Sequence, residues 1–102
     1  MDELESEAGS AVRSREVLRE PPLYQVLLLN DDYTTMEFVV YILRQVFNKS
    51  GEDAEKIMLT VHQEGKAVVG VYTREIAETK IALVAHQAKE SEFPLRCVMQ
   101  VV

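Results

Sequence analysis

Three stretches of the chain have the hydrophobic pattern of β-strands. Residues 23–29 are rich in Leu and Val without helical spacing, and Asn30-Asp31-Asp32 follows them, which predicts a buried central strand that ends in a turn. The β-branched run over residues 67–72 predicts a second strand. Over residues 95–101 apolar residues alternate with Arg96 and Gln100, which predicts a third strand with one face in water.

The segments between these strands carry apolar residues at helical spacing. Thr34 and Glu37 form a T-x-x-E capping box, which predicts a helix that runs to about Asn48. A second helix is expected to begin with the acidic residues after Ser50-Gly51 and to end at Gly65 as its C-cap. Its apolar side comprises Ile57, Met58 and Val61.

Thr73 is expected to N-cap a third helix that continues to about Lys89. The core face of this helix is predicted to comprise Ile76, Ala77, Ile81 and Val84. The resulting order is βααβαβ. We therefore predict an α+β fold, a compact two-layer α/β sandwich in which three helices cover one side of a three-stranded sheet.

The first residues of the chain differ from the rest. Residues 1–21 are polar, acidic at first, and lack sustained apolar periodicity, so we expect a flexible N-terminal tail that Pro21-Pro22 closes. Residues 22–102 are expected to form one core domain, because a chain of 102 residues builds a single core.

Composition and charge restrict the class of function. With 47% hydrophobic residues the chain is globular, and its net charge of -6 argues against nucleic acid as a partner. No apolar run reaches the roughly 20 residues that span a bilayer, so no membrane contact is expected. The single Cys97 and the absence of a signal-peptide pattern predict a cytoplasmic protein, and nothing in the pattern predicts an oligomer, so a monomer is expected.

The densest polar cluster in an apolar neighbourhood is Asn30-Asp31-Asp32, at the end of the first predicted strand. A strand end holds ligand-contacting groups rigidly, although Asn and Asp also form tight turns by bonding their own backbone. Residue type alone favours the turn interpretation.

A second candidate group lies on the second predicted helix, where Met58, Val61 and His62 share one face. Taken alone, a histidine beside apolar neighbours is better explained as a core or boundary residue, and the methionines as core residues. Together with Asp31, however, His62 could hold an ammonium group, and Met36 and Met58 could line an adjoining apolar pocket.

The sequence contains no signature of a metal site or of catalysis. One Cys and two His residues do not have the spacing of a zinc site, and neither a nucleophile motif nor a Gly-rich phosphate loop is present. We therefore expect no metal, no cofactor and no enzymatic activity.

Four longer segments of the chain carry a further signal, namely YQVLLLNDDYTTMEFV at residues 24–39, MLTVHQEGKA at 58–67, TREIAETK at 73–80 and PLRC at 94–97. These segments resemble the ClpS family, the adaptors of the ClpA or ClpC protease complexes. They occur in the family's order and with similar spacing. Thr35 departs from the family pattern, in which proline is frequent at that position.

The resemblance implies an adaptor that binds N-degrons, proteins whose first residue is Leu, Phe, Tyr or Trp, and delivers them to the Clp ATPase for degradation. By resemblance, Asn30, Asp31 and His62 would hold the terminal amine and the first peptide bond. The resemblance also implies a hydrophobic pocket made of Leu28, Thr34, Met36, Val39, Met58, Val61 and Leu95. Met36 would act as a gate against β-branched residues, and Glu75 and Lys80 would face the N-terminal domain of the ATPase.

Two other functions fit parts of the pattern. A small α/β sandwich of this order also resembles the C-terminal domain of the ribosomal stalk protein, a module that binds translation factors. A hydrolase that uses Asp31 and His62 would need a nucleophile that the sequence lacks. The combination of Asn30, Asp31 and His62 separates the adaptor from the factor-binding module, which has no evident need for it.

Overall fold

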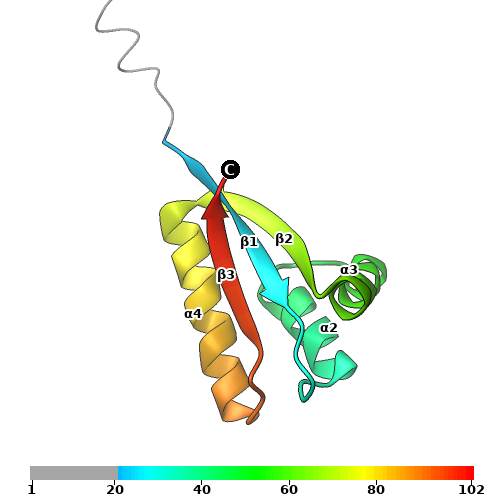
Figure 1. Ribbon diagram of the computed structural model, residues 1–102. Coiled ribbons are helices and arrows are strands. Elements are labelled where there is room, and N and C mark those ends of the chain that lie inside the picture. The colour runs from blue at the N-terminus through cyan, green and yellow to red at the C-terminus, as the bar shows by residue number, and fades with distance from the viewer. Residues whose placement is uncertain (1–20) are drawn as a thin grey trace, which may run out of the picture.

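The computed structural model describes residues 21–102, and its three strands form one antiparallel sheet (Figure 1). The central strand β1 (Leu23–Leu29) pairs with β2 (Lys66–Thr73) on one side and with β3 (Arg96–Val101) on the other. The helices are α2 (Met36–Gln45), α3 (Gly51–Glu64) and α4 (Arg74–Glu90). The predicted fold class and the order βααβαβ are confirmed, whereas the predicted tail lies, apart from Pro21, outside the described residues.

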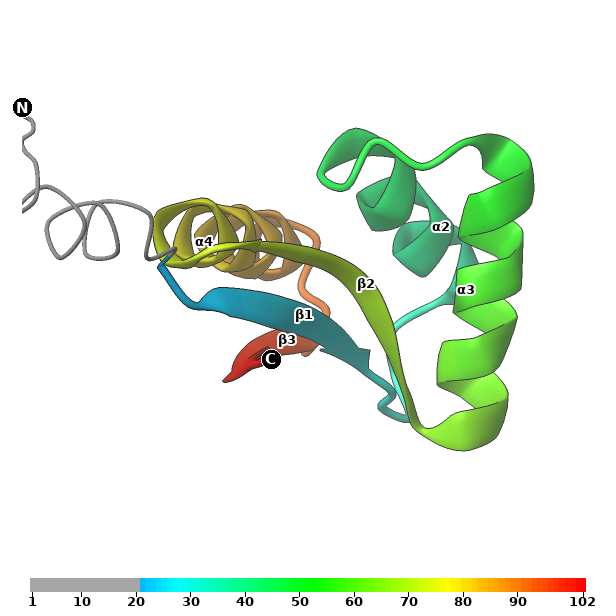
Figure 2. The ribbon, with the colours of Figure 1, turned by 90° about the horizontal axis from the view of Figure 1, so that it is seen from above.

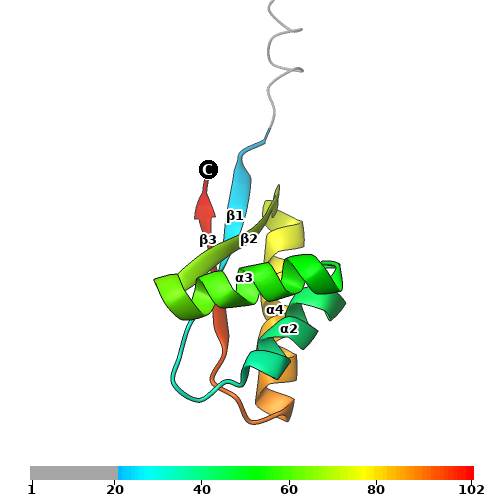
Figure 3. The same ribbon diagram turned by 90° about the vertical axis from the view of Figure 1, so that its right-hand side faces the viewer.

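The central position of β1 follows from its composition. Val26, Leu27 and Leu28 are all buried, as expected for a strand that has a neighbour on each side. α4 lies along one face of the sheet and contacts all three strands, whereas α3 contacts α2 and β2 (Figures 1 and 2). Figure 3 shows α3 running across the molecule beside β2 and α2. The end of β1 therefore faces the helix pair α2 and α3.

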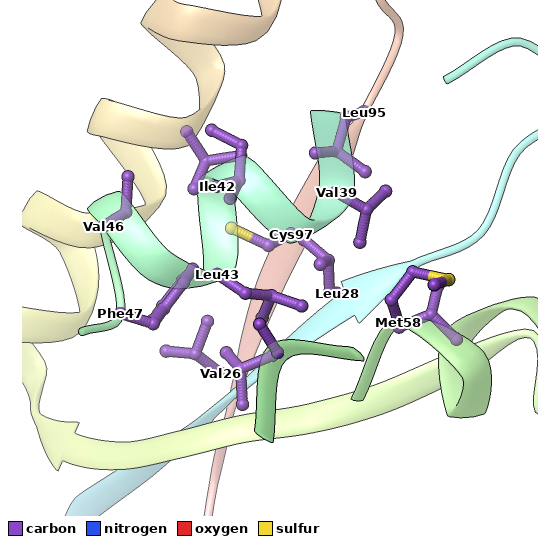
Figure 4. Close-up of a cluster of buried hydrophobic side chains, with 14 of the residues drawn as sticks. Val26, Leu28, Val39, Ile42, Leu43, Val46, Phe47, Met58, Leu95 and Cys97 are labelled. Carbon is purple, nitrogen blue, oxygen red and sulfur yellow. The ribbon is translucent and has the colours of Figure 1, made fainter. Parts of the chain in front are cut away.

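The hydrophobic core fills the space between the sheet and the helices (Figure 4). Its most deeply buried large side chains come from β1, β2, α2 and α4, and they are Val26, Leu28, Ile42, Leu43, Val69 and Val84. Burial of each such side chain contributes about 2 kcal/mol. This core holds the ends of β1, α2 and α3 in a fixed arrangement.

The start of α2 differs from the prediction by one residue. Thr35, not Thr34, is the N-cap, and its hydroxyl accepts a hydrogen bond from the Phe38 N–H at 3.1 Å. The capping box that we expected at Thr34 is therefore wrong, because the Thr34 side chain is bonded to the preceding loop. The helix also ends at Gln45, before the expected Asn48, which has a left-handed φ of 56°.

The limits of α3 and α4 agree better with the sequence pattern. Gly65 ends α3 with a φ of 91°, the left-handed conformation that glycine adopts without strain. Thr73 is the N-cap residue of α4.

The predicted core face of α4 is correct only in part. Ala77 and Val84 are buried, but Ile76 is 48% exposed, so its predicted place in the core is wrong. Its neighbour Ala77 faces the sheet, and one step of about 100° around the helix turns Ile76 away from it.

Candidate functional site

The loop between β1 and α2 is organised by one carboxylate. Oδ1 of Asp31 accepts hydrogen bonds from the backbone N–H groups of Tyr33 at 2.8 Å and Thr34 at 2.7 Å. Its Oδ2 accepts a third bond, at 2.7 Å, from the Thr34 hydroxyl. Asp residues favour such turns because their short side chain reaches the backbone two and three residues ahead. Asp31 therefore both shapes the loop and places a negative charge in it.

These hydrogen bonds also determine the ionisation of Asp31. Burial raises the pKa of its carboxyl group, but the bonds from the Thr34 hydroxyl and from the N–H groups of Thr34 and Tyr33 outweigh burial and lower the pKa below its usual value. The group is therefore a carboxylate at neutral pH. Asp32, the next residue, is exposed and shares none of these bonds.

A backbone contact joins this loop to the end of α3. The N–H of Asn30 donates to the carbonyl of Gly65 at 2.9 Å, and Gly65 directly follows the last turn of α3. His62 lies in that last turn, where it is exposed. The hydrogen bond thus holds Asn30 close to the turn that carries His62, although the two residues are far apart in the sequence.

The loop and the two helices enclose a cavity of about 240 Å³. One part of its lining is polar and consists of Asn30, Asp31, Asp32, Thr34 and His62. The remainder is apolar and consists of Met36, Val39, Met58 and Val61. We call these two parts the polar rim and the apolar wall. Such a cavity can hold a positively charged polar group and an apolar group that are covalently joined.

Most of the site residues predicted from the sequence line this cavity. Leu28 and Leu95 do not, since they are 0% and 4% exposed and belong to the buried cluster that also contains Val39 and Met58 (Figure 4). Leu28 and Leu95 thus belong to the core on which the residues of the apolar wall pack. Asp32 lines the cavity but was not among the predicted binding residues, although its position in the Asn-Asp-Asp cluster was a signal for it.

The two residues predicted to face an ATPase lie away from the cavity, on α4. Glu75 is exposed in the first turn of this helix. The Nζ of Lys80 donates to the carbonyl of Val46 at 2.7 Å and lies 5.7 Å and 5.4 Å from the ring centroids of Phe47 and Tyr72. Lys80 therefore stabilises the C-terminal end of α2 as a cation at a helix C-terminus does.

Within residues 21–102 no three His, Cys, Asp or Glu side chains gather as a metal site would require, and no helix is long and apolar enough to cross a membrane. Cys97 is a free thiol in the core, where burial raises its pKa to about 11. Such a thiol stays protonated at neutral pH and is a poor nucleophile.

Comparison with known proteins gives a consistent result. Residues 19–98 match the family model described as "ATP-dependent Clp protease adaptor protein ClpS". A relative of that description from Phenylobacterium zucineum is 54% identical, with 94% of each chain covered. Another, from Caulobacter vibrioides, is 60% identical over 80% of this chain and 75% of its own length.

A solved structure matches the fold as well. It is that of Agrobacterium tumefaciens ClpS2 bound to L-phenylalaninamide, which superposes with a TM-score of 0.79 at 44% identity and covers 81% of this chain and 100% of its own. From the family match and these identities, the chain belongs to the ClpS family of ATP-dependent Clp protease adaptors.

Proposed function

We propose that this adaptor binds proteins with a bulky hydrophobic first residue, namely Leu, Phe, Tyr or Trp, and delivers them to a Clp ATPase for degradation. The observation that carries the proposal is the cavity in which the polar rim adjoins the apolar wall. Its volume of about 240 Å³ suits one side chain, since sites for drug-sized ligands begin at about 300 Å³. The phenylalaninamide of the solved relative has the chemistry that such a cavity requires, a free amine beside an aromatic side chain.

In this proposal the polar rim binds the terminal ammonium group. An ammonium has three N–H donors and no acceptor, so each donor needs an oxygen or an imidazole nitrogen when water is displaced. Asp31 supplies the negative charge, while Asn30 and His62 supply further acceptors. The backbone N–H of Asn30 is bonded to Gly65, which leaves its side-chain amide for the first peptide bond of the substrate.

The apolar wall would hold the first side chain. Met58 and Val61 are buried and fixed by the core, whereas Met36 is 44% exposed at the cavity mouth. A methionine can adapt its shape to Leu, Phe, Tyr or Trp. A residue branched at Cβ places bulk close to the mouth, where Met36 would exclude it.

We further propose that the adaptor acts by binding alone. Within the described residues, the three hydrogen bonds that Asp31 accepts come from Tyr33 and Thr34, and none comes from His62. The buried Cys97 lies in the core rather than in the cavity lining. A hydrolase would need a nucleophile next to an effective general base. The Thr34 hydroxyl in the lining does donate to Asp31, but that carboxylate also accepts two backbone N–H groups and its pKa is lowered, which makes it a weak base.

The partner proposed for delivery is the N-terminal domain of a Clp ATPase, ClpA or ClpC, contacted by Glu75 and Lys80. Glu75 is the better test, because loss of Lys80 would also weaken the end of α2. Glu75→Ala is expected to weaken capture by the isolated ATPase domain. Glu90→Ala, at the other end of the same helix, is the matched control and should leave capture by the ATPase domain unchanged.

The amine-binding step is tested by fluorescence anisotropy with a labelled peptide that begins with Phe. The same peptide with an acetylated amine, and a version beginning with Ala, are expected not to bind. His62→Ala should weaken binding of the Phe peptide, whereas His86→Ala, which removes an exposed histidine of α4, should not. Equal binding of the free and acetylated peptides would disprove recognition of the terminus.

A further inference from the structure

A second cavity adjoins the polar rim on the side of β3. Its volume is about 350 Å³, and it shares Asn30, Asp31 and Asp32 with the first cavity. The lining is completed by Leu29, Tyr33, Pro94 and Arg96. The two cavities are therefore separated only by the loop that, in the proposed function, holds the terminal amine.

Tyr33 is an unusual residue at this place. Tyr33 is 77% exposed, more than any other aromatic residue in the described part of the chain. Its backbone N–H, by contrast, is bonded to Asp31. The loop is thus fixed by the backbone of Tyr33 while the ring remains free to contact a ligand. Exposed tyrosines next to a cavity are typical contact residues, because the ring offers a large rigid surface at low entropic cost.

The direction in which a bound chain leaves the first cavity follows from its own polar groups. Each peptide unit beyond the first residue carries an N–H and a C=O that need partners. A groove of about 350 Å³ that shares Met36 and Met58 with the first cavity is completed by Glu37, Val40 and Glu55. Its carboxylates can accept from a peptide N–H, but they cannot donate to a C=O. The exit across Asn30 toward Arg96 offers amide and guanidinium donors as well as carboxylate acceptors. The polar exit is therefore favoured.

We infer that the cavity between Tyr33, Pro94 and Arg96 is a subsite for the second residue of the substrate, and that it prefers an uncharged apolar side chain. The inference rests on the proposed function. Tyr33 and Pro94 supply the apolar contact. When the ammonium of the ligand offsets the charge of Asp31, the remaining Asp32 and Arg96 carry opposite charges, so the subsite has no net charge to select an acidic or a basic residue.

The test compares three ligands, namely phenylalaninamide, Phe-Gly-amide and Phe-Leu-amide, by calorimetry or by competition with a labelled peptide. The wild-type protein should bind Phe-Leu-amide about five-fold more tightly than Phe-Gly-amide, as expected when a leucine side chain is partly buried against the Tyr33 ring. In Tyr33→Ser this advantage should fall below about two-fold, while the affinity for phenylalaninamide is unchanged. Tyr41→Ser, which removes a tyrosine that is 46% exposed and lines neither cavity, should behave as wild type.

The possible failures of this test are distinguishable. If phenylalaninamide binds but leucine gives no advantage, or if the advantage survives Tyr33→Ser, the subsite is disproved and the proposed function stands. If Val40→Ser, in the groove beside Met36, removes the advantage instead, the chain leaves across the methionines and the inference is wrong. If none of the three ligands binds, both the subsite and the proposed function fail.

Discussion

The two parts of the cavity lining are built in different ways. The polar rim lies on a loop whose conformation is fixed by the three hydrogen bonds to Asp31 and by the bond between Asn30 and Gly65. The apolar wall lies on helices, and its outermost residue, Met36, is 44% exposed and flexible. A charge must be met by acceptors in fixed positions, whereas an apolar side chain needs only a surface that closes around it. Rigidity is therefore needed at the rim and adaptability at the wall.

Removal of Asp31 should have the largest effect, because this residue serves both the charge and the shape of the rim. We expect Asp31→Ala to weaken binding of a peptide that begins with Phe by roughly 2 kcal/mol, or about 30-fold. It should also lower stability by about 1 kcal/mol, because the N–H groups of Tyr33 and Thr34 lose their acceptor. Anisotropy and thermal unfolding measure the two effects.

Asp31→Asn is the variant that separates charge from shape. Its amide oxygen can still accept from both N–H groups but carries no charge, so stability should fall less than in Asp31→Ala while affinity falls as in Asp31→Ala. Wild-type affinity in Asp31→Asn would show that the negative charge is not needed. The contrast between rim and wall would then lose its electrostatic basis.

Met36→Ala tests whether the wall selects by shape. The substitution should open the mouth of the cavity and raise the affinity for peptides that begin with Ile or Val by about ten-fold relative to wild type. Leu59→Ala is the matched control, because Leu59 is also 44% exposed and does not line the cavity. If the β-branched peptides are still rejected, the exclusion originates in the buried part of the wall and Met36 is not the gate.

The apolar wall could be predicted from local spacing, but the arrangement of the rim could not. Met58 and Val61 share a helix face by periodicity alone, and their common placement in the cavity followed from it. The bond from Asn30 to Gly65 depends on how β1 and α3 pack, which no local pattern contains.

Two threonines in succession illustrate the same limit. Thr34 and Thr35 both suit an N-cap, and the T-x-x-E pattern favoured Thr34. In the structure the Thr34 hydroxyl donates to Asp31, so Thr35 is the N-cap instead.

The distance of Leu28 and Leu95 from the surface also depends on tertiary packing. An apolar residue in such a sequence pattern can lie either in the wall of a pocket or in the core behind it. Sequence patterns predict which face a residue is on, and packing decides how far it lies from the surface.

Thr34→Val should have a smaller effect on the rim, because only one of the three hydrogen bonds to Asp31 is lost. We expect affinity to fall by about five-fold, with Thr34→Ser restoring it. A steric explanation is excluded if the serine variant, which lacks the methyl group, binds like wild type. Equal affinity of the valine variant and wild type would show that the two backbone bonds suffice.

The pH dependence of the same pair gives a second measurement. The folded pKa of Asp31 is lowered, so the carboxylate stabilises the loop at pH values above the ordinary carboxyl pKa of 3.8. That contribution is lost as the pH falls through the lower folded value. Without the Thr34 hydroxyl the folded pKa should rise toward the ordinary value, so in unfolding experiments between pH 7 and 3 Thr34→Val should lose less stability than wild type. Identical pH profiles would mean that the hydroxyl does not stabilise the carboxylate.

The smallest expected effect concerns motion behind the wall, which Cys97 can report. Cys97 on β3 pairs with Leu28 on β1 and is 8% exposed. Because burial raises its pKa to about 11, roughly a thousandth of the thiol is ionised at pH 8. Alkylation should therefore be slow and should require local opening of the core. A bound Phe peptide fills the cavity in front of this layer and should slow alkylation by about two- to three-fold. Acetylated peptide should leave the rate unchanged. If the Phe peptide binds without slowing the reaction, the core behind the wall opens independently of the cavity, and the adaptability of the wall is confined to Met36.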